Sequence, residues 1–214
     1  MKTISKIQYI TQSKTGQSIL DEVNAVLEAG VDWVQLRIKN DDLDVMSIAK
    51  QVKQLTDKYD ATLIINDRIN IAQSINADGV HLGLTDQPIN EARHILGNDK
   101  IIGGTANTSA DAKNVELLGA DYIGLGPFRE TKTKAKLSPV LGLKGYQSII
   151  PKINKYGWDI LNFNIPIIAI GGLRVADIKL LKQETGIYGV ALSSLIYQSA
   201  NKKELVEELK TILL

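Results

Sequence analysis

The sequence predicts a single-domain (β/α)8 barrel, with residues 1–214 forming one folding unit. Three observations predict this fold. Short β-branched segments recur about eight times, amphipathic segments separate them, and no Gly-x-Gly-x-x-Gly motif follows the first of them. Strands that alternate with helices build right-handed βαβ units and a parallel sheet, and eight such units close into a barrel. A doubly wound open sheet is the alternative, because 214 residues lie near the lower end of the roughly 200–400 residue range of barrels.

The expected strands are short apolar runs, most of them rich in isoleucine and valine. They cover residues 7–10, 31–37, 62–65, 79–82, 100–104, 122–126, 165–170 and 189–193. Their lengths are typical of strands rather than of helices.

The expected helices have apolar side chains at helical spacing, as at Val45, Ile48 and Val52. They cover residues 42–59, 89–96, 110–118, 143–153, 175–183 and 203–213. Glycines are expected to end helices at positions 30, 97, 119 and 186.

The composition excludes several classes of function. The net charge is +1, from 25 Lys and Arg against 24 Asp and Glu, which gives no bulk electrostatic basis for nucleic-acid binding. The absence of cysteine excludes disulfides, thiolate nucleophiles and cysteine metal sites. No apolar run approaches the ~18 residues that span a bilayer, and no signal-peptide pattern opens the chain, so we expect a cytoplasmic protein. The oligomeric state is left open, and a homo-oligomer is compatible with the sequence.

The second expected strand carries polar side chains on one face. Because side chains alternate along a strand, Gln35, Arg37 and Lys39 share a face, while Val34 and the other apolar residues pack on helices. In a barrel the active site lies at the carboxyl ends of the strands, so Arg37 and Lys39 are expected at its mouth. The alternative is an edge strand with a solvated polar face.

Two carboxylates follow the next two expected strands. Asp67 comes directly after Asn66 at the end of the third strand, and Asp86 lies shortly after the fourth. Each alone is equally explained as a helix N-cap. Together they can reach one hard cation, and Mg²⁺ usually takes one or two protein carboxylates plus substrate phosphate oxygens. His81, in the fourth strand, is interpreted as a structural residue.

Small residues end the later strands. Thr105 follows the fifth strand, Gly171 and Gly172 follow the seventh, and Ser193 and Ser194 follow the eighth. In barrels, such residues after the last two strands let backbone N–H groups approach a phosphate. A tight turn is the alternative for the glycine pair.

The connection 128–141 has no apolar periodicity and carries threonines and lysines at 131–134. Long connections without periodicity are often functional, and a solvated charge run is the alternative.

These motifs resemble the thiamine phosphate synthase family, together with its thiazole tautomerase relatives. The matching segments run in the family's order through nearly the whole chain. They are Gln-Leu-Arg-Ile-Lys at 35–39, Ile-Asn-Asp-Arg at 65–68, Ala-Asp-Gly-Val-His-Leu-Gly at 77–83, Gly-Ala-Asp-Tyr-Ile-Gly-Leu-Gly-Pro at 119–127, Thr-Lys-Thr-Lys at 131–134 and Ala-Ile-Gly-Gly at 169–172.

The resemblance implies an enzyme that condenses 4-amino-2-methyl-5-pyrimidinylmethyl diphosphate with thiazole phosphate, giving thiamine phosphate and diphosphate. It implies that Mg²⁺ is held by Asp67 and Asp86. It implies a pyrimidine-diphosphate site formed by Gln35, Arg37, Lys39, Asn66, Thr105 and Lys134. It implies a thiazole-phosphate site formed by Thr131, Lys132, Thr133, Gly172, Ser193 and Ser194. Lys39 and Lys134 are the predicted catalytic residues, because with Mg²⁺ they would stabilise the leaving diphosphate.

Several segments depart from the family pattern. Leu84 and Thr85 replace the usual Gln-Glu before the metal aspartate, and Thr105 replaces the usual serine. Arg129 and Glu130 precede the 131–134 motif where apolar residues and proline are common.

Three alternative functions stay open at this point. The first is a thiazole tautomerase, although the resemblance implies a histidine where this chain has Asn107. The second is a non-catalytic regulator that binds thiazole phosphate, and the third is another phosphate-binding barrel isomerase. The preference between carboxylated and decarboxylated thiazole phosphate is not fixed by the sequence.

Overall fold

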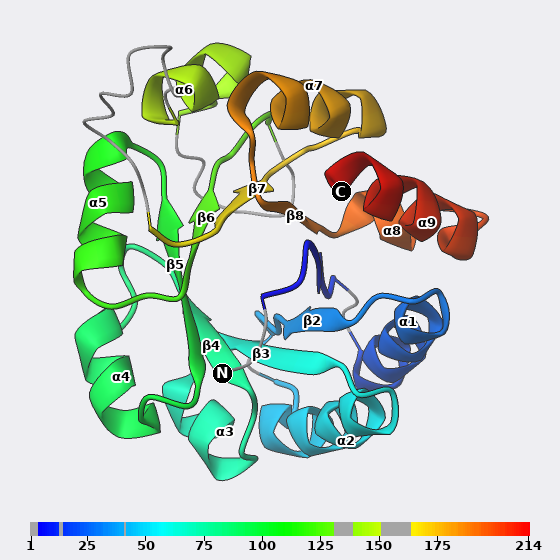
Figure 1. Ribbon diagram of the computed structural model, residues 1–214. Helices are drawn as coiled ribbons and strands as arrows, with labels where there is room; N and C mark the ends of the chain where they lie inside the picture. Colours follow the sequence, from blue (N-terminus) through cyan, green and yellow to red (C-terminus); the bar gives the residue numbers. More distant parts are fainter. Residues whose placement is uncertain (1–3, 13–14, 41, 131–138, 151–163) are drawn as a thin grey trace.

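The structure, a computed structural model, describes residues 4–12, 15–40, 42–130, 139–150 and 164–214. Eight parallel strands form a closed barrel in the order β1 to β8, which confirms the predicted (β/α)8 fold and excludes the open sheet. Figure 1 shows the ring of strands surrounded by helices. The strands are β1 (Ile7–Ile10), β2 (Trp33–Leu36), β3 (Thr62–Asn66), β4 (Gly79–Leu82), β5 (Ile101–Ala106), β6 (Tyr122–Leu125), β7 (Ile167–Ile170) and β8 (Gly189–Leu192).

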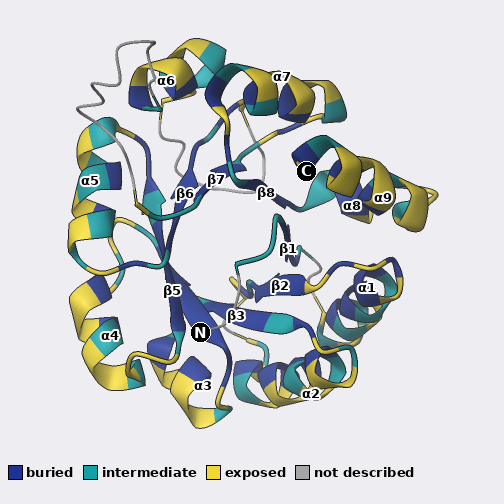
Figure 2. Ribbon diagram, in the orientation of Figure 1, coloured by how far each residue is buried: buried dark blue, intermediate teal, exposed yellow. Residues whose placement is uncertain are grey.

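Helices follow the strands and cover the outside of the barrel. They are α1 (Gly16–Glu28), α2 (Val45–Lys58), α3 (Ile69–Ser74), α4 (Ile89–Leu96), α5 (Ser109–Leu117), α6 (Gly142–Ile149), α7 (Val175–Thr185), α8 (Ser194–Tyr197) and α9 (Lys202–Leu213). Figure 2 shows that the strands are buried, whereas the helices have a buried inner face and an exposed outer face. Among the described residues, no helix is long and apolar enough to cross a bilayer.

Glycines end several helices as expected. Gly97 and Gly186 are C-cap residues, and Gly30 and Gly119 follow the C-caps of α1 and α5. All four have positive φ, between 65° and 90°. A residue without a Cβ adopts this backbone conformation without strain, which explains why glycine stands at these positions.

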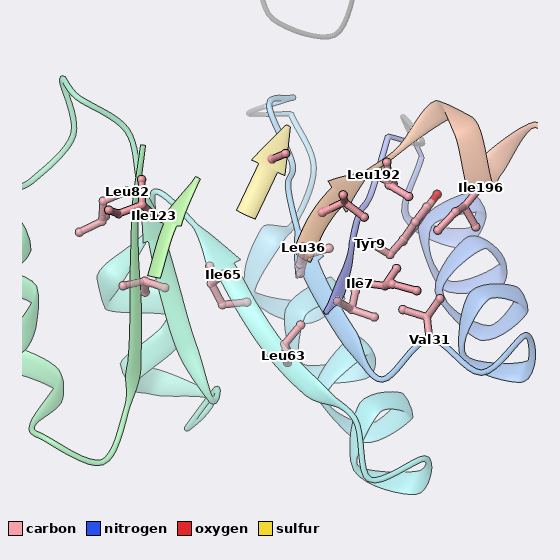
Figure 3. Close-up of a cluster of buried hydrophobic side chains, with 14 of the residues drawn as sticks. Ile7, Tyr9, Val31, Leu36, Leu63, Ile65, Leu82, Ile123, Leu192 and Ile196 are labelled. Atoms are coloured by element: carbon pink, nitrogen blue, oxygen red, sulfur yellow. The ribbon is translucent and has the colours of Figure 1, made fainter. Parts of the chain in front are cut away.

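Two layers of apolar side chains stabilise the barrel. The larger cluster lies between strands and helices and includes Val34, Leu36 and Ile38, as the alternation in β2 predicts. Figure 3 shows part of this cluster, with Tyr9 and Ile196 among the labelled side chains. The smaller cluster comprises Ile10, Trp33, Ile64, Ile101, Tyr122, Ile168 and Ala191. Each of these residues lies in a strand, an odd number of positions from the strand residues of the larger cluster. Side chains alternate along a strand, so this cluster lies on the inner face and fills the barrel interior.

Candidate functional site

Charged side chains gather where β2, β3 and β4 end. The ammonium group of Lys39, just beyond β2, contacts Oδ2 of Asp67, just beyond β3. Asp67 in turn shares a hydrogen bond with Asp86, which follows β4, and it lies close enough to Arg37 to interact electrostatically with it. The structure therefore brings together four of the predicted site residues at one rim of the barrel.

The backbone at Asp67 has an uncommon conformation. Its φ is +62°, in the left-handed region that Asp and Asn tolerate better than most residues. Its N–H donates to the carbonyl oxygen of His81 at 2.9 Å, which ties the end of β3 to β4. Strained positions of this kind cluster at functional sites because the surrounding structure fixes the side chain there.

Neither carboxylate is a helix N-cap residue. The N-cap of α3 is Arg68 and that of α4 is Pro88. Asp86 instead accepts a hydrogen bond from the N–H of Gly83 at 2.6 Å and so closes the turn after β4. The capping alternative for Asp67 and Asp86 is therefore wrong.

The two carboxylates differ in their pKa. Burial opposes ionisation of Asp67, but hydrogen bonds from Asp86 and Lys39 hold its pKa below the ordinary value. Burial, and then the neighbouring Asp67 carboxylate, raise the pKa of Asp86. Two carboxylates in contact therefore share a proton, because both cannot ionise freely side by side. Without the shared proton the pair would carry two negative charges, one more than Lys39 neutralises, and a divalent cation can take the place of that proton.

This donor set fits a hard divalent cation. Mg²⁺ favours carboxylate oxygens and commonly takes one or two from the protein, with water and substrate phosphate supplying the others. In the described part of the chain no group of three or more His, Cys, Asp or Glu side chains is placed to hold a metal. Asp67 and Asp86 are thus suited to a cation that is shared with a phosphorylated ligand.

A chain of buried polar side chains crosses the barrel interior beneath this rim. Gln35 Nε2 donates to Gln8 Oε1 at 2.9 Å, and Gln8 Nε2 donates to the Tyr122 hydroxyl at 3.1 Å. The two ring nitrogens of His81 lie 3.0 Å from that hydroxyl and 3.0 Å from Thr105 Oγ1. The predicted residues Gln35 and Thr105 are therefore connected, through groups on β1, β6 and β4.

Glycines make room for this interior chain. A Cβ built on Gly103 would lie 2.0 Å from Cζ of Tyr122, and one on Gly124 would lie 3.0 Å from Cε1 of His81. Both positions accept no larger residue without movement of the Tyr122 or His81 ring. His81, Tyr122 and Gln8 were not assigned to the site from the sequence. The alternation of side chains along β4 and β6 could have placed His81 and Tyr122 on the inner face of the barrel.

The small residues after β7 and β8 also lie at the carboxyl ends. Gly171 and Gly172 have φ of 95° and 66°, so they form a tight turn into α7. Ser194 Oγ donates to Gln12 Oε1 at 3.1 Å, after β1. The hydroxyl oxygen of Ser193 is buried and has no hydrogen-bond partner among the described residues.

Two predictions stay partly or wholly without structural placement. Asn66 is the half-buried last residue of β3, beside Asp67, and its carbonyl oxygen accepts a hydrogen bond from the N–H of Arg68 at 2.8 Å. Thr131, Lys132, Thr133 and Lys134 lie outside the described residues, as does most of the connection 128–141.

A closed parallel barrel whose charged side chains gather at the carboxyl ends of the strands defines the class: a (β/α)8-barrel enzyme. The family model for thiamine monophosphate synthase matches residues 7–196. The chain belongs to this family.

Individual relatives match over nearly their full length. A thiamine-phosphate synthase of Flavobacterium johnsoniae is 49% identical, over 96% of this chain and 94% of the relative. One of Bacteroides fragilis is 46% identical, over 97% of this chain and 98% of the relative. The solved structure of a thiamine phosphate pyrophosphorylase from Pyrococcus furiosus is 31% identical, has a TM-score of 0.78, and covers 97% of this chain and 95% of its own.

Proposed function

We propose that the chain joins the pyrimidine diphosphate to thiazole phosphate and releases thiamine phosphate and diphosphate, with the help of Mg²⁺. The observation that carries this proposal is the contact of Lys39, Asp67 and Asp86 at the barrel rim, in a chain of this family. A lysine beside paired carboxylates suits a ligand that carries both a diphosphate and a divalent cation.

Asp67 and Asp86 would hold the Mg²⁺, which when bound neutralises charge on the departing diphosphate. Lys39 adds a positive charge from the protein at the same rim, where its side chain is 55% exposed and can turn toward a ligand. Arg37 is half-buried, and burial lowers the pKa of its guanidinium, although the nearby Asp67 carboxylate acts in the opposite direction. These groups stabilise the charge that develops on the leaving group, which is electrostatic catalysis.

The reaction is a substitution at the methylene carbon of the pyrimidine. The carbon–oxygen bond breaks and its electron pair leaves with the diphosphate. The thiazole nitrogen then forms the new carbon–nitrogen bond with its lone pair. Gln35, which is hydrogen-bonded to Gln8 in the barrel interior, and Thr105, which is hydrogen-bonded to His81, would orient the pyrimidine. The protein mainly positions the two substrates and excludes water.

At position 107, where the resemblance implies a histidine in thiazole tautomerases, this chain has no side chain that can accept a proton. Asn107 is buried, and its amide donates to the carbonyl oxygen of Gly126 at the end of β6. A carboxamide does not titrate and cannot serve as a general base. Asn107 therefore has a structural role in joining the ends of β5 and β6.

The proposal is tested by supplying the purified protein with both substrates and Mg²⁺. We expect diphosphate and thiamine phosphate to appear in equal amounts, and neither to appear when one substrate is left out. Thiamine phosphate is identified by mass spectrometry and diphosphate by a coupled assay. Isomerisation of a thiazole phosphate without diphosphate release would instead identify a tautomerase. Binding of thiazole phosphate without any turnover would identify a non-catalytic binding protein.

A further inference from the structure

We propose that Arg129 and Asp177 are a positioning pair that fixes the turn at Gly171 and Gly172, and through it the thiazole-phosphate subsite. This inference rests on the function proposed above. Arg129 follows β6, and Asp177 lies in the first turn of α7, which follows β7. The pair therefore joins two neighbouring strand-to-helix connections at the carboxyl ends of the strands.

The contact between the two side chains is bidentate. Arg129 Nε donates to Asp177 Oδ2 at 2.9 Å, and Arg129 Nη2 donates to Oδ1 at 2.6 Å. The Asp177 side chain is only 7% exposed, whereas that of Arg129 is 47% exposed. Hydrogen bonds from Arg129 hold the pKa of Asp177 below its ordinary value, so the carboxylate is charged at neutral pH. Two parallel charge-assisted bonds define one geometry, which a single point charge does not.

The same carboxylate also holds the start of α7. Asp177 Oδ2 accepts a hydrogen bond from the N–H of Arg174 at 3.0 Å, the arrangement of a carboxylate at the third helical position. Asp177 therefore links Arg129 on one side to the backbone of the N-cap residue on the other. The residues between β7 and this N-cap are Gly171, Gly172 and Leu173.

The glycine turn is also in close contact with the segment that carries Arg129. The N–H of Phe128 donates to Ile170 O and that of Arg129 donates to Gly171 O, each at 2.9 Å. A Cβ on Gly171 would lie 2.6 Å from Pro127 Cβ, and one on Gly172 would lie 2.9 Å from Arg129 Cβ. The backbone of residues 127–129 thus determines where the turn can lie.

A glycine can contact a phosphate only through its main chain. If Gly172 holds the thiazole phosphate, the position of its N–H group depends on the contacts that fix the main chain at this turn. Arg129 and Asp177 do this from outside the subsite, since Arg129 is bound to Asp177 rather than directed at a ligand.

The test compares Arg129→Gln, Arg129→Lys and Asp177→Asn with a matched control, Arg93→Gln. Arg93 also pairs with an aspartate, Asp121, at 2.7 Å, but Asp121 directly precedes β6 and lies at the opposite end of the barrel. Steady-state kinetics give KM for each substrate and kcat, and calorimetry gives the affinity for thiazole phosphate alone.

We expect Arg129→Gln and Asp177→Asn to raise KM and Kd for thiazole phosphate about tenfold. KM for the pyrimidine diphosphate should change less than about twofold. Arg129→Lys should recover part of the affinity, because it keeps the charge but only one donor group. Arg93→Gln should leave both KM values unchanged.

Unchanged affinity for thiazole phosphate in Arg129→Gln, or an equal rise in both KM values, would overturn the inference in favour of a purely structural pair. A loss of affinity for thiazole phosphate in Arg129→Gln, with no loss of affinity in Asp177→Asn, would also overturn the inference. Arg129 would then bind the phosphate directly. If the wild-type protein binds thiazole phosphate but forms no product, the proposed function fails, while the calorimetry still decides the role of the pair.

Discussion

Replacing Asp67 or Asp86 with asparagine is expected to lower kcat/KM for the pyrimidine diphosphate on the order of 100-fold, about 2.7 kcal/mol of transition-state stabilisation. An amide keeps the size of the side chain but removes the negative charge that a divalent cation needs. Asparagine tolerates the positive φ at position 67, so the backbone there is not strained by the change. At position 86 the amide oxygen can still accept from the N–H of Gly83. The two variants therefore test the loss of negative charge with little change in the shape of the side chain.

The measurement is the initial rate of each variant across a Mg²⁺ titration, with the free energy of unfolding in urea as a check on the fold. The control is Asp57→Asn on α2, since the Asp57 side chain is exposed and forms an ion pair with Lys53, away from the rim. Its rate should equal that of the wild type. A near-normal rate and Mg²⁺ dependence in Asp67→Asn and Asp86→Asn would remove both residues from the metal site.

An electron-withdrawing substituent on the pyrimidine is expected to slow the chemical step on the order of 1000-fold, about 4 kcal/mol. The proposed site gathers groups that would stabilise a leaving diphosphate, namely Lys39, Arg37 and the carboxylate pair proposed to hold Mg²⁺. The described part of the rim offers no cysteine or histidine nucleophile, and His81 is engaged with Tyr122 and Thr105. We therefore expect carbon–oxygen cleavage to run ahead of carbon–nitrogen bond formation, which leaves positive charge on the pyrimidine.

The rate must be measured in a single turnover at saturating substrates, so that binding and product release do not conceal the chemistry. A substituent of equal size that donates electrons is the matched control, and it should not slow the step. An unchanged or faster chemical step with the electron-poor pyrimidine would contradict the dissociative mechanism. The proposed synthase activity could survive that result.

The architecture of the barrel was predictable because each unit carries its own local pattern. The predicted strand 79–82 and the predicted helix 89–96 coincide with β4 and α4. Strand ends were less predictable: β2 spans Trp33–Leu36, shorter than the predicted 31–37, because its ends depend on pairing with neighbours rather than on apolar character.

Helices α1, α3 and α8 lie outside the predicted helices. The short α3 and α8, of 6 and 4 residues, are too brief for a helical period to be recognised. Helix α1 was not predicted from the sequence, although its apolar residues have helical spacing. Its buried side chains include Ile19, Val23, Val26 and Leu27.

The candidate site was predictable where it depends on strand ends, and not where it depends on long-range contacts. Alternation along β2 and the position of Asp67 after β3 were enough to place Lys39 and Asp67 at one rim. By contrast, Arg129 and Asp177 are 48 positions apart, and Gln8 and Tyr122 are 114 apart. Periodicity reports only local structure, so neither pair can be inferred from one sequence.

The central claim is that Asp67 and Asp86 hold a Mg²⁺ that thiamine phosphate formation requires. It is tested most directly by measuring product formation in the presence of a metal chelator and again after Mg²⁺ is restored in excess. The variant that carries both Asp67→Asn and Asp86→Asn is measured in parallel. We predict that the wild-type protein forms no product with the chelator and recovers its full rate with Mg²⁺, while the double variant recovers less than about one hundredth of that rate. Full turnover of the wild type in the presence of the chelator, or full recovery of the double variant, would contradict the claim.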